Sequence, residues 1–300
     1  MMIRHLFYLP WWYLRSCLLG GRRPLQTVLF LSDRCNLRCK HCAVYARKEP
    51  VSKTYAQVER ELRGAYARGS RFVDFEGGEP FLWRDGDRTV NDLCDLARKI
   101  GFFTTTITTN AQLPFPGSHA HSIWVSMDGV GSYHDEIRGE GAFEKLERNI
   151  AGCGHPHLSV NMVVNKLNYT QIKAAADYAR QNPAIEQISF NFHTPYEGTE
   201  HLYIDDWDLR VRLLDEIIAL KKAGYPIMNS VSGLKRMKDL NFEKACWVSE
   251  FIMVDGTLLS ECPGKVSGVC DRCGFCMAGE MYSVLHFKPD TLAAGFKLRM

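Results

Sequence analysis

The chain has 300 residues, enough for one large domain or for one domain with a smaller extension. Its apolar fraction of 46% and its charged fraction of 24% are ordinary for a globular protein. The formal net charge of +3 is small, so composition gives no reason to expect nucleic acid as a partner.

The first segment, residues 1–24, is apolar and aromatic, but Pro10 and Arg15 interrupt it. Its apolar stretch, residues 5–20, falls short of the ~20 mostly apolar residues that a membrane span needs, and no small-residue cleavage site follows it. We favour a helix packed on the core. The alternative is an interfacial helix that makes a peripheral membrane contact, with Arg22 and Arg23 facing anionic lipid.

Six short apolar runs separated by amphipathic stretches predict alternating strands and helices. The predicted strands are 27–31, 72–76, 103–108, 122–127, 158–164 and 186–192. The predicted helices are 53–68, 88–100, 142–151, 168–181 and 208–223, the first with Ser52 as N-cap and Gly69 as terminator. Six such units predict an α/β fold, an open partial (β/α)6 barrel over residues 25–232.

One face of the predicted strands is polar. In the last strand, Ile188 and Phe190 share one face, whereas Ser189 and Asn191 share the other. A closed hydrophobic barrel would be apolar on both faces. We therefore expect a lumen that holds a cofactor and a polar substrate, with a sheet solvated on one face as the alternative.

The pattern changes after residue 232. Residues 250–261 predict a hairpin that turns on Asp255-Gly256. Cysteines flank this hairpin and fill the tail that follows it, which predicts a smaller cysteine-rich domain over 233–300.

Eight of the eleven cysteines fall into two groups, and a chain of this size does not need a disulfide framework. Clustered thiols indicate metal or iron–sulfur ligation in a reducing cytoplasm. Cys35, Cys39 and Cys42 directly follow the first predicted strand. Three thiolates on one loop can hold one face of a cubane cluster and leave the fourth iron open. A zinc site, the alternative, would usually add a fourth Cys or a His.

Four motifs carry a resemblance to a known family: CNLRCKHC at 35–42, FEGGEP at 75–80, WVSMDG at 124–129 and HDEIRG at 134–139. Together they resemble the radical S-adenosylmethionine (radical SAM) superfamily over roughly residues 25–195. The resemblance implies an enzyme whose [4Fe–4S] cluster reduces SAM to methionine and a 5′-deoxyadenosyl radical. It also implies an electron donor such as flavodoxin or ferredoxin.

The resemblance further implies which residues bind SAM. Gly77 and Gly78 leave room for its methionine end, and Glu79 either helps to hold the ammonium or has a structural role. Ser126 and Arg138 match positions that grip the carboxylate and ribose region. Asn110 and His41 match positions near the cofactor and its adenine, respectively. For Asp128 a turn cap is an equal alternative.

The C-terminal cysteines resemble the SPASM/twitch extensions that bind auxiliary clusters. The group comprises Cys246, Cys262, Cys270, Cys273 and Cys276, with Gly256 between the first two. Five residues separate Gly256 from Cys262, where the family pattern usually has four. The resemblance implies one auxiliary [4Fe–4S] cluster held by four of the five, and a tetrathiolate zinc site is the alternative. The aspartate that some SPASM maturases carry after the hairpin cysteine is missing, because Pro263 stands there.

Substrate contacts are expected in the loop that follows the last predicted strand. His193, Tyr196 and Glu197 follow the last predicted strand and are candidates for substrate contact or catalysis. A capping loop is the alternative for each. Three functions stay open: modification of a small molecule or lipid, SPASM-type maturation of a peptide or protein, and a non-catalytic iron–sulfur carrier or sensor. The GGEP motif and the Ser126/Arg138 pair argue against the last, since a carrier needs no SAM.

Overall fold

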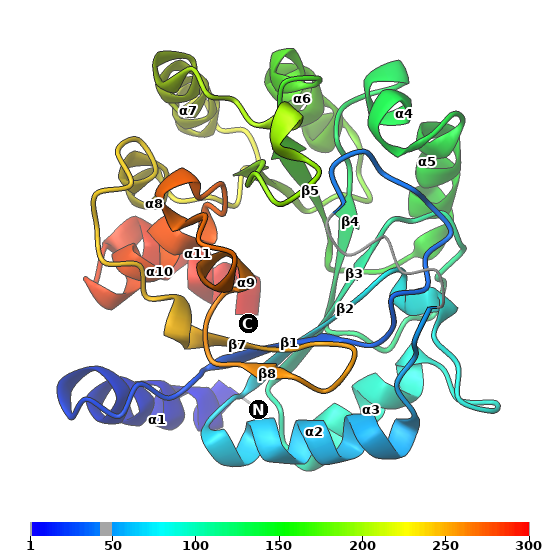
Figure 1. The fold of residues 1–300 in the computed structure, drawn as a ribbon, viewed down its shortest axis with the longest axis vertical. Helices are drawn as coiled ribbons and strands as arrows, with labels where there is room; N and C mark the ends of the chain where they lie inside the picture. Colours follow the sequence, from blue (N-terminus) through cyan, green and yellow to red (C-terminus); the bar gives the residue numbers. More distant parts are fainter. Residues whose placement is uncertain (1, 43–49, 300) are drawn as a thin grey trace.

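The fold is built on one curved sheet with helices outside it (Figure 1). This computed structural model describes residues 2–42 and 50–299. The strand order is β6-β5-β4-β3-β2-β1-β7-β8. The strands are β1 (Gln26–Phe30), β2 (Phe72–Glu76), β3 (Thr104–Thr109), β4 (Ser122–Ser126), β5 (Leu158–Val164), β6 (Gln187–Phe192), β7 (Ser249–Ile252) and β8 (Leu258–Leu259). Strands β1 to β6 pair in parallel, each beside the next, which confirms the open partial (β/α)6 barrel.

Five of the barrel helices lie where the sequence predicts them, and α4 is an additional one. They are α2 (Tyr55–Arg68), α3 (Val90–Ile100), α4 (Ser132–Arg138), α5 (Ala142–Cys153), α6 (Ile172–Gln181) and α7 (Trp207–Lys222). Gly69 ends α2 with φ of 128°. The predicted N-cap, Ser52, was wrong: Thr54 accepts from Gln57 N, because Ser52 forms a β-bridge to Ser32.

Alternation along the strands separates an apolar outer face from a polar lumen. On β2, Val73 and Phe75 are fully buried in the hydrophobic core with Leu62 of α2. The opposite face carries Asp74 and Glu76. On the same side of the sheet, polar side chains bond across neighbouring strands: Thr106 to Ser122 at 3.0 Å, and both Ser189 and Asn191 to Asn161. The inner face is therefore polar, as the alternation predicts.

The C-terminal segment continues the same sheet. Strand β7 pairs in parallel with β1, and the short helices α8 (Val231–Arg236) and α9 (Pro263–Val266) flank it in sequence. Figure 1 shows α8, α10 (Met277–Leu285) and α11 (Pro289–Arg299) at the open side of the barrel. The β7–β8 hairpin forms as predicted, but its loop spans residues 253–257, wider than a two-residue turn. A domain boundary at residue 232 stays a prediction.

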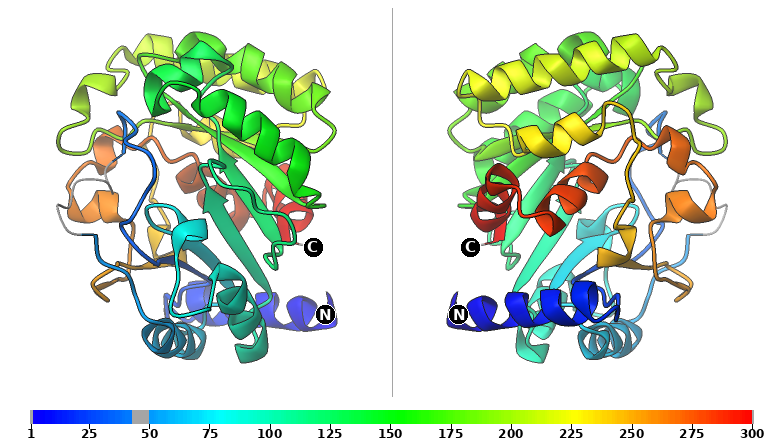
Figure 2. Two further views of the ribbon diagram at one scale, coloured as in Figure 1. Left: turned by 90° about the vertical axis from the view of Figure 1, so that its right-hand side faces the viewer. Right: turned by 90° about the vertical axis from the view of Figure 1, so that its left-hand side faces the viewer.

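The N-terminal helix α1 (Met2–Tyr13) lies at the end of the molecule opposite α6 and α7, as Figures 1 and 2 show. Trp12 is 4% exposed and stacks on Trp247, and Tyr8 Oη donates to Gly69 O. One face of α1 is therefore packed on the fold. The other face leaves apolar side chains exposed: Phe7, Trp11, Leu14 and Leu18, the last two in the π-helical turn that follows. None of the helices within the described residues has the length and apolar character needed to cross a bilayer.

Candidate cluster and cofactor site

The first three motif cysteines lie on the loop that leaves the carboxyl end of β1. Electrostatic interactions among the thiols of Cys35, Cys39 and Cys42 indicate that they lie near one another. Burial raises the pKa of Cys39 to about 11, and the neighbouring Arg138 guanidinium acts in the opposite direction. Three N–H groups point at sulfur: Leu37 N and Asn110 Nδ2 reach Cys35 Sγ at 3.5 and 3.6 Å, and Arg138 Nη1 reaches Cys39 Sγ at 3.8 Å.

The glycine pair after β2 packs directly under this loop. A Cβ at Gly77 would meet Ser32 O at 2.3 Å, and one at Gly78 would meet Arg34 O at 2.1 Å. The backbone of the two segments also pairs, since Gly78 N donates to Ser32 O at 2.6 Å. A side chain at either position would clash with the backbone of the cysteine loop, so the described structure requires glycine at both.

Glu79 and Asn110 fasten the ends of β2 and β3 to the same loop. The Glu79 carboxylate is 1% exposed and accepts hydrogen bonds from Phe81 N, Thr109 Oγ1 and Asn110 N. Asn110 Nδ2 in turn donates to Asn36 Oδ1 at 2.8 Å. Both carboxylate oxygens of Glu79 therefore accept hydrogen bonds from residues at or just after the ends of β2 and β3.

Asp128, after β4, is the centre of a buried charge network. Its Oδ2 accepts from Arg138 Nε at 2.7 Å and lies 3.5 Å from His41 Nε2, and its Oδ1 accepts from Val163 N. Burial alone would raise the pKa of Asp128, but Arg138, His41 and His134 outweigh it and hold that pKa at about 2. Asp128 is thus an ionised anchor for Arg138.

Two neutral histidines flank this aspartate. Burial lowers the pKa of His41 and of His134 to about 4 each, so both imidazoles are neutral near pH 7. His134 Nδ1 accepts from Asp128 N at 3.2 Å. His41 Nδ1 and His134 Nε2 are buried with no hydrogen-bond partner among the described residues. Buried nitrogens without a partner are rare in folded proteins, so these two call for a functional explanation.

The five C-terminal cysteines lie on separate segments that follow α8. Cys246 precedes β7, Cys262 caps α9, and Cys276 caps α10. Burial raises the pKa of Cys246 to about 12. The next largest effects on this pKa are electrostatic and come from Cys262, Cys273 and Cys270. These four thiols therefore share one neighbourhood.

Gly274 locks the cysteine tail onto the barrel. A Cβ at this residue would meet Phe192 O at 1.8 Å, so only glycine fits. Phe192 N donates to Gly274 O at 2.8 Å, and Cys276 N donates to Asn191 Oδ1 at 2.9 Å. The second cysteine group is thus fixed beside β6, at the same carboxyl edge of the sheet as the first.

The sequence pattern of the Radical SAM superfamily matches residues 29–182, about half of the chain. The chain belongs to the radical SAM superfamily. Members of this family are enzymes that use a [4Fe–4S] cluster together with SAM.

Individual radical SAM relatives resemble the chain at modest identity. Fe-coproporphyrin III synthase of Methanosarcina barkeri is 27% identical over 271 residues, which cover 81% of this chain and 64% of that protein. A probable GTP 3′,8-cyclase of Methanocella arvoryzae is 27% identical over 194 residues, 59% of this chain and 61% of the relative. The chain thus spans less than two thirds of the length of both relatives.

A solved structure shares the radical SAM fold. Streptococcus suis SuiB, crystallised with S-adenosylmethionine, superposes with a TM-score of 0.62 at 21% identity, over 91% of this chain and 68% of SuiB. At this identity the likeness concerns the fold alone. The fold found in this chain is therefore that of the radical SAM barrel with its C-terminal extension of the sheet.

The residues present fit a radical SAM cluster. N–H donors directed at the sulfur atoms of Cys35 and Cys39 favour thiolates, the form in which cysteine ligates iron. No three His, Cys, Asp or Glu side chains in the described ranges converge closely enough to hold a single ion.

The remaining candidates fall in different places. Ser126 ends β4. His193 is buried, and its Nε2 bonds to Thr199 O at 2.9 Å, as in a capping loop. Tyr196 lies against the second cysteine group, with its hydroxyl beside Cys262, and burial together with these thiols raises its pKa. Glu197 is exposed.

Sequence reasoning missed two further groups. Glu76 faces the lumen on β2, where burial and the neighbouring Asp74 raise its pKa to about 7. Arg210 on α7 is buried against the C-terminal cysteines. The polar alternation on β2 could have identified Glu76, but Arg210 reads as an ordinary helix-surface arginine.

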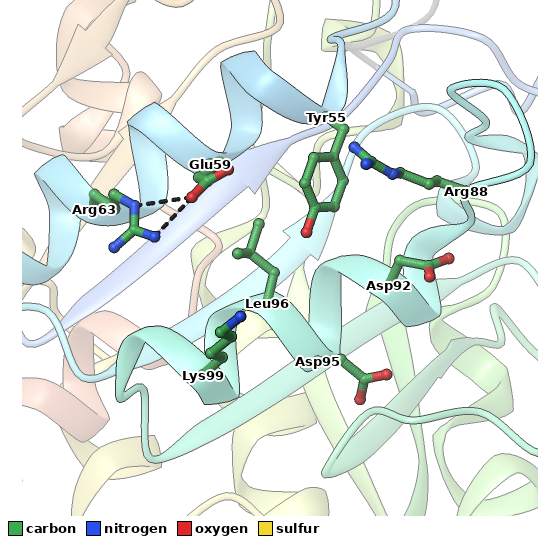
Figure 3. A pocket seen from close by; sticks show the side chains of 8 residues that line it. All are labelled: Tyr55, Glu59, Arg63, Arg88, Asp92, Asp95, Leu96 and Lys99. Carbon is green, nitrogen blue, oxygen red and sulfur yellow. Dashed lines mark hydrogen bonds and ion pairs between the residues drawn. The ribbon is translucent and has the colours of Figure 1, made fainter.

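A separate hollow lies on the outside of the barrel, between α2 and α3 (Figure 3). Its lining includes the surface ion pair of Arg63 with Glu59, and the Arg88 guanidinium packs over the Tyr55 ring. The other lining residues are Asp92, Asp95, Leu96 and Lys99. These side chains lie on two covering helices and the loop before α3, so this hollow is distinct from the candidate site.

Proposed function

We propose that this radical SAM protein is an enzyme that reductively cleaves SAM and uses the resulting radical to modify a substrate. The observation that carries the proposal is the loop after β1, where three cysteines share one loop and N–H groups point at two of their sulfurs. When bound there, the cluster supplies the electron for C–S cleavage. The chain itself holds the loop through Asn110, the glycine pair and Arg138.

We propose that SAM lies across the carboxyl ends of β2, β3 and β4. Gly77, Gly78 and Glu79 border it on one side, and Ser126 and Arg138 on the other. His41 and Asn110 complete this contact set. The buried unpaired nitrogen of His41 supports the assignment, and Asp128 holds Arg138 in place as a positioning residue.

We propose one auxiliary [4Fe–4S] cluster, held by four of the five C-terminal cysteines. The shared neighbourhood of these thiols and the locking of their loop by Gly274 support it. A tetrathiolate zinc site is the alternative. An electron donor such as flavodoxin or ferredoxin in the cytoplasm would feed both clusters.

We propose a small molecule or a lipid as substrate, with a peptide as the alternative. Two relatives named above carry names of small-molecule chemistry, an iron-coproporphyrin synthase and a GTP cyclase. SuiB has also been crystallised with its precursor peptide SuiA, and a peptide-modifying role is the second candidate. The polar lumen with Asp74 and Glu76 supports a substrate with polar groups.

The exposed apolar side chains of Phe7, Trp11, Leu14 and Leu18 support a peripheral membrane contact. Co-sedimentation with anionic vesicles tests this contact. Trp11→Ser combined with Leu18→Ser should reduce sedimentation while circular dichroism stays unchanged. A wild-type protein that never sediments would contradict it.

The activity is tested by anaerobic reconstitution with iron and sulfide, followed by measurement of 5′-deoxyadenosine after reduction. Wild-type protein should form it, and Cys35→Ala, Cys39→Ala and Cys42→Ala should not. Cys17→Ala is the matched control, because Cys17 lies outside both cysteine groups. Product formation by a Cys39→Ala protein, or none by wild type with a full cluster, would overturn the proposal.

A further inference from the structure

Arg210 of α7 is a buried cation next to the second cysteine group. Its side chain is 1% exposed. Nη2 donates to Cys273 O at 2.5 Å, and the guanidinium carbon lies 4.9 Å from the Phe192 ring centroid and 5.0 Å from that of Trp207. The side chain thus joins α7, the end of β6 and the cysteine tail.

Among the described side chains, no Asp or Glu is among the largest influences on the Arg210 charge, and Arg210 Nε is buried with no hydrogen-bond partner. The other buried arginine of the site, Arg138, pairs with Asp128 at 2.7 Å. A buried, unpaired charge is costly, so a native fold normally supplies a counter-charge.

The groups that do stabilise the Arg210 charge are Cys276, Tyr203 and Cys273. A neutral thiol or phenol offers only a weak dipole. The same thiols carry negative charge once they ligate iron, because the thiolate is the ligand form. The missing counter-charge would therefore arrive with an iron–sulfur cluster.

We propose that Arg210 is a positioning residue for the auxiliary cluster, holding the Cys273 backbone and balancing the negative charge of the thiolate-ligated iron. This inference rests on the auxiliary cluster proposed above. Reduction adds one electron to an already negative cluster. A buried cation beside it favours the reduced form and raises the reduction potential. Lys244 also acts on Cys273 and supplies a second positive charge nearby.

The test isolates the auxiliary cluster in full-length protein that carries Cys35→Ala, Cys39→Ala and Cys42→Ala. Reductive titration followed by electron paramagnetic resonance then gives its potential. Arg210→Met should make reduction at least tenfold less favourable, which is 59 mV for one electron. Arg210→Lys should restore most of the shift. The control is Arg212→Met, which removes an exposed charge two residues along the same helix.

An Arg210→Met protein with full iron and an unchanged potential would overturn the inference. Should the methionine variant lose its iron, Arg210→Gln and Arg210→Lys decide. Iron retained by lysine and lost by glutamine supports charge balance, whereas equal behaviour of the two refutes it. A triple-alanine protein without any iron would instead refute the auxiliary cluster, and the inference with it.

Discussion

Arg138 Nε donates to Asp128 Oδ2 at 2.7 Å, and the two side chains are 8% and 0% exposed. This pair links α4 to the loop after β4, and the second arm of the guanidinium reaches Cys39 Sγ. Arg138, which the family resemblance assigned to SAM binding, therefore also belongs to a charge network within the protein. Loss of either partner leaves the other charge buried.

The Asp128–Arg138 pair should show strong coupling. Arg138→Met and Asp128→Asn should each lower the free energy of unfolding by about 3–5 kcal/mol, because each strands one buried partner. The double variant should lose less than the sum of the two. Urea denaturation of the four proteins measures this coupling, and strict additivity would contradict it. Equilibrium binding of SAM to Arg138→Met should weaken about tenfold to hundredfold.

The two cysteine groups should assemble iron independently. They lie on different segments, after β1 and beside β6, and Gly274 fixes the second without the first. Replacing Cys35, Cys39 and Cys42 together by alanine should abolish SAM cleavage and remove the iron of one cluster, leaving that of the other. Iron and sulfide counting on the purified variant measures this. Complete loss of iron would show that no independent second cluster exists.

Gly78→Ala should displace the first cysteine loop, because a Cβ there would meet Arg34 O at 2.1 Å and Cys35 N at 2.9 Å. We expect lower iron content and loss of SAM cleavage. Gly152→Ala is the matched control: it lies within α5, has open space around its Cβ, and should stabilise the helix by about 0.5–1 kcal/mol. Full iron in the Gly78→Ala protein would show that the loop tolerates the shift.

Glu76 should make stability depend on pH. Burial and Asp74 raise its pKa from 4.5 to about 7, so the folded protein keeps a proton that the unfolded chain releases. This proton stabilises the fold below pH 4.5, and its contribution is lost as the pH rises through 7. Relative to wild type, Glu76→Gln should therefore gain about 1–3 kcal/mol between pH 5 and pH 8.

Chemical denaturation at both pH values, followed by tryptophan fluorescence, measures the difference for Glu76→Gln. The control is Glu140→Gln, because Glu140 is exposed on the surface. Parallel pH curves for Glu76→Gln and wild type would mean that the Glu76 carboxyl is solvated in the lumen.

Substitutions of the two adjacent tryptophans on α1 should change the free energy of unfolding by different amounts. Trp12 is 4% exposed and packs on Trp247, whereas Trp11 is 44% exposed. Trp12→Ala should lower the free energy of unfolding by about 3–5 kcal/mol, and Trp11→Ala should change it by no more than about 0.5 kcal/mol. Thermal or urea denaturation distinguishes them. Equal effects would mean that α1 packs through a different face.

Local patterns in the sequence were sufficient to predict the barrel. Strands β2 and β5 have the predicted bounds, and the other four barrel strands differ by no more than one residue at either end. The cysteine loop after β1 was equally local. Period-two alternation and helix signals lie within a few residues of one another, so they can be recognised without knowing which segment packs against them.

Contacts between distant segments were decided only by the tertiary structure. The sequence around Arg210 does not indicate that its guanidinium meets Cys273, 63 residues later. The motif that contains Gly78 gives no sign that Arg34 O lies against it. Alternation tells which face of an element is buried, but the partner of a buried charge or a missing side chain depends on which segments pack together. The contacts of Asp128, Arg210 and the two glycines therefore depend on the tertiary structure, which places the carboxyl ends of β1, β2, β4 and β6 at the same edge of the sheet.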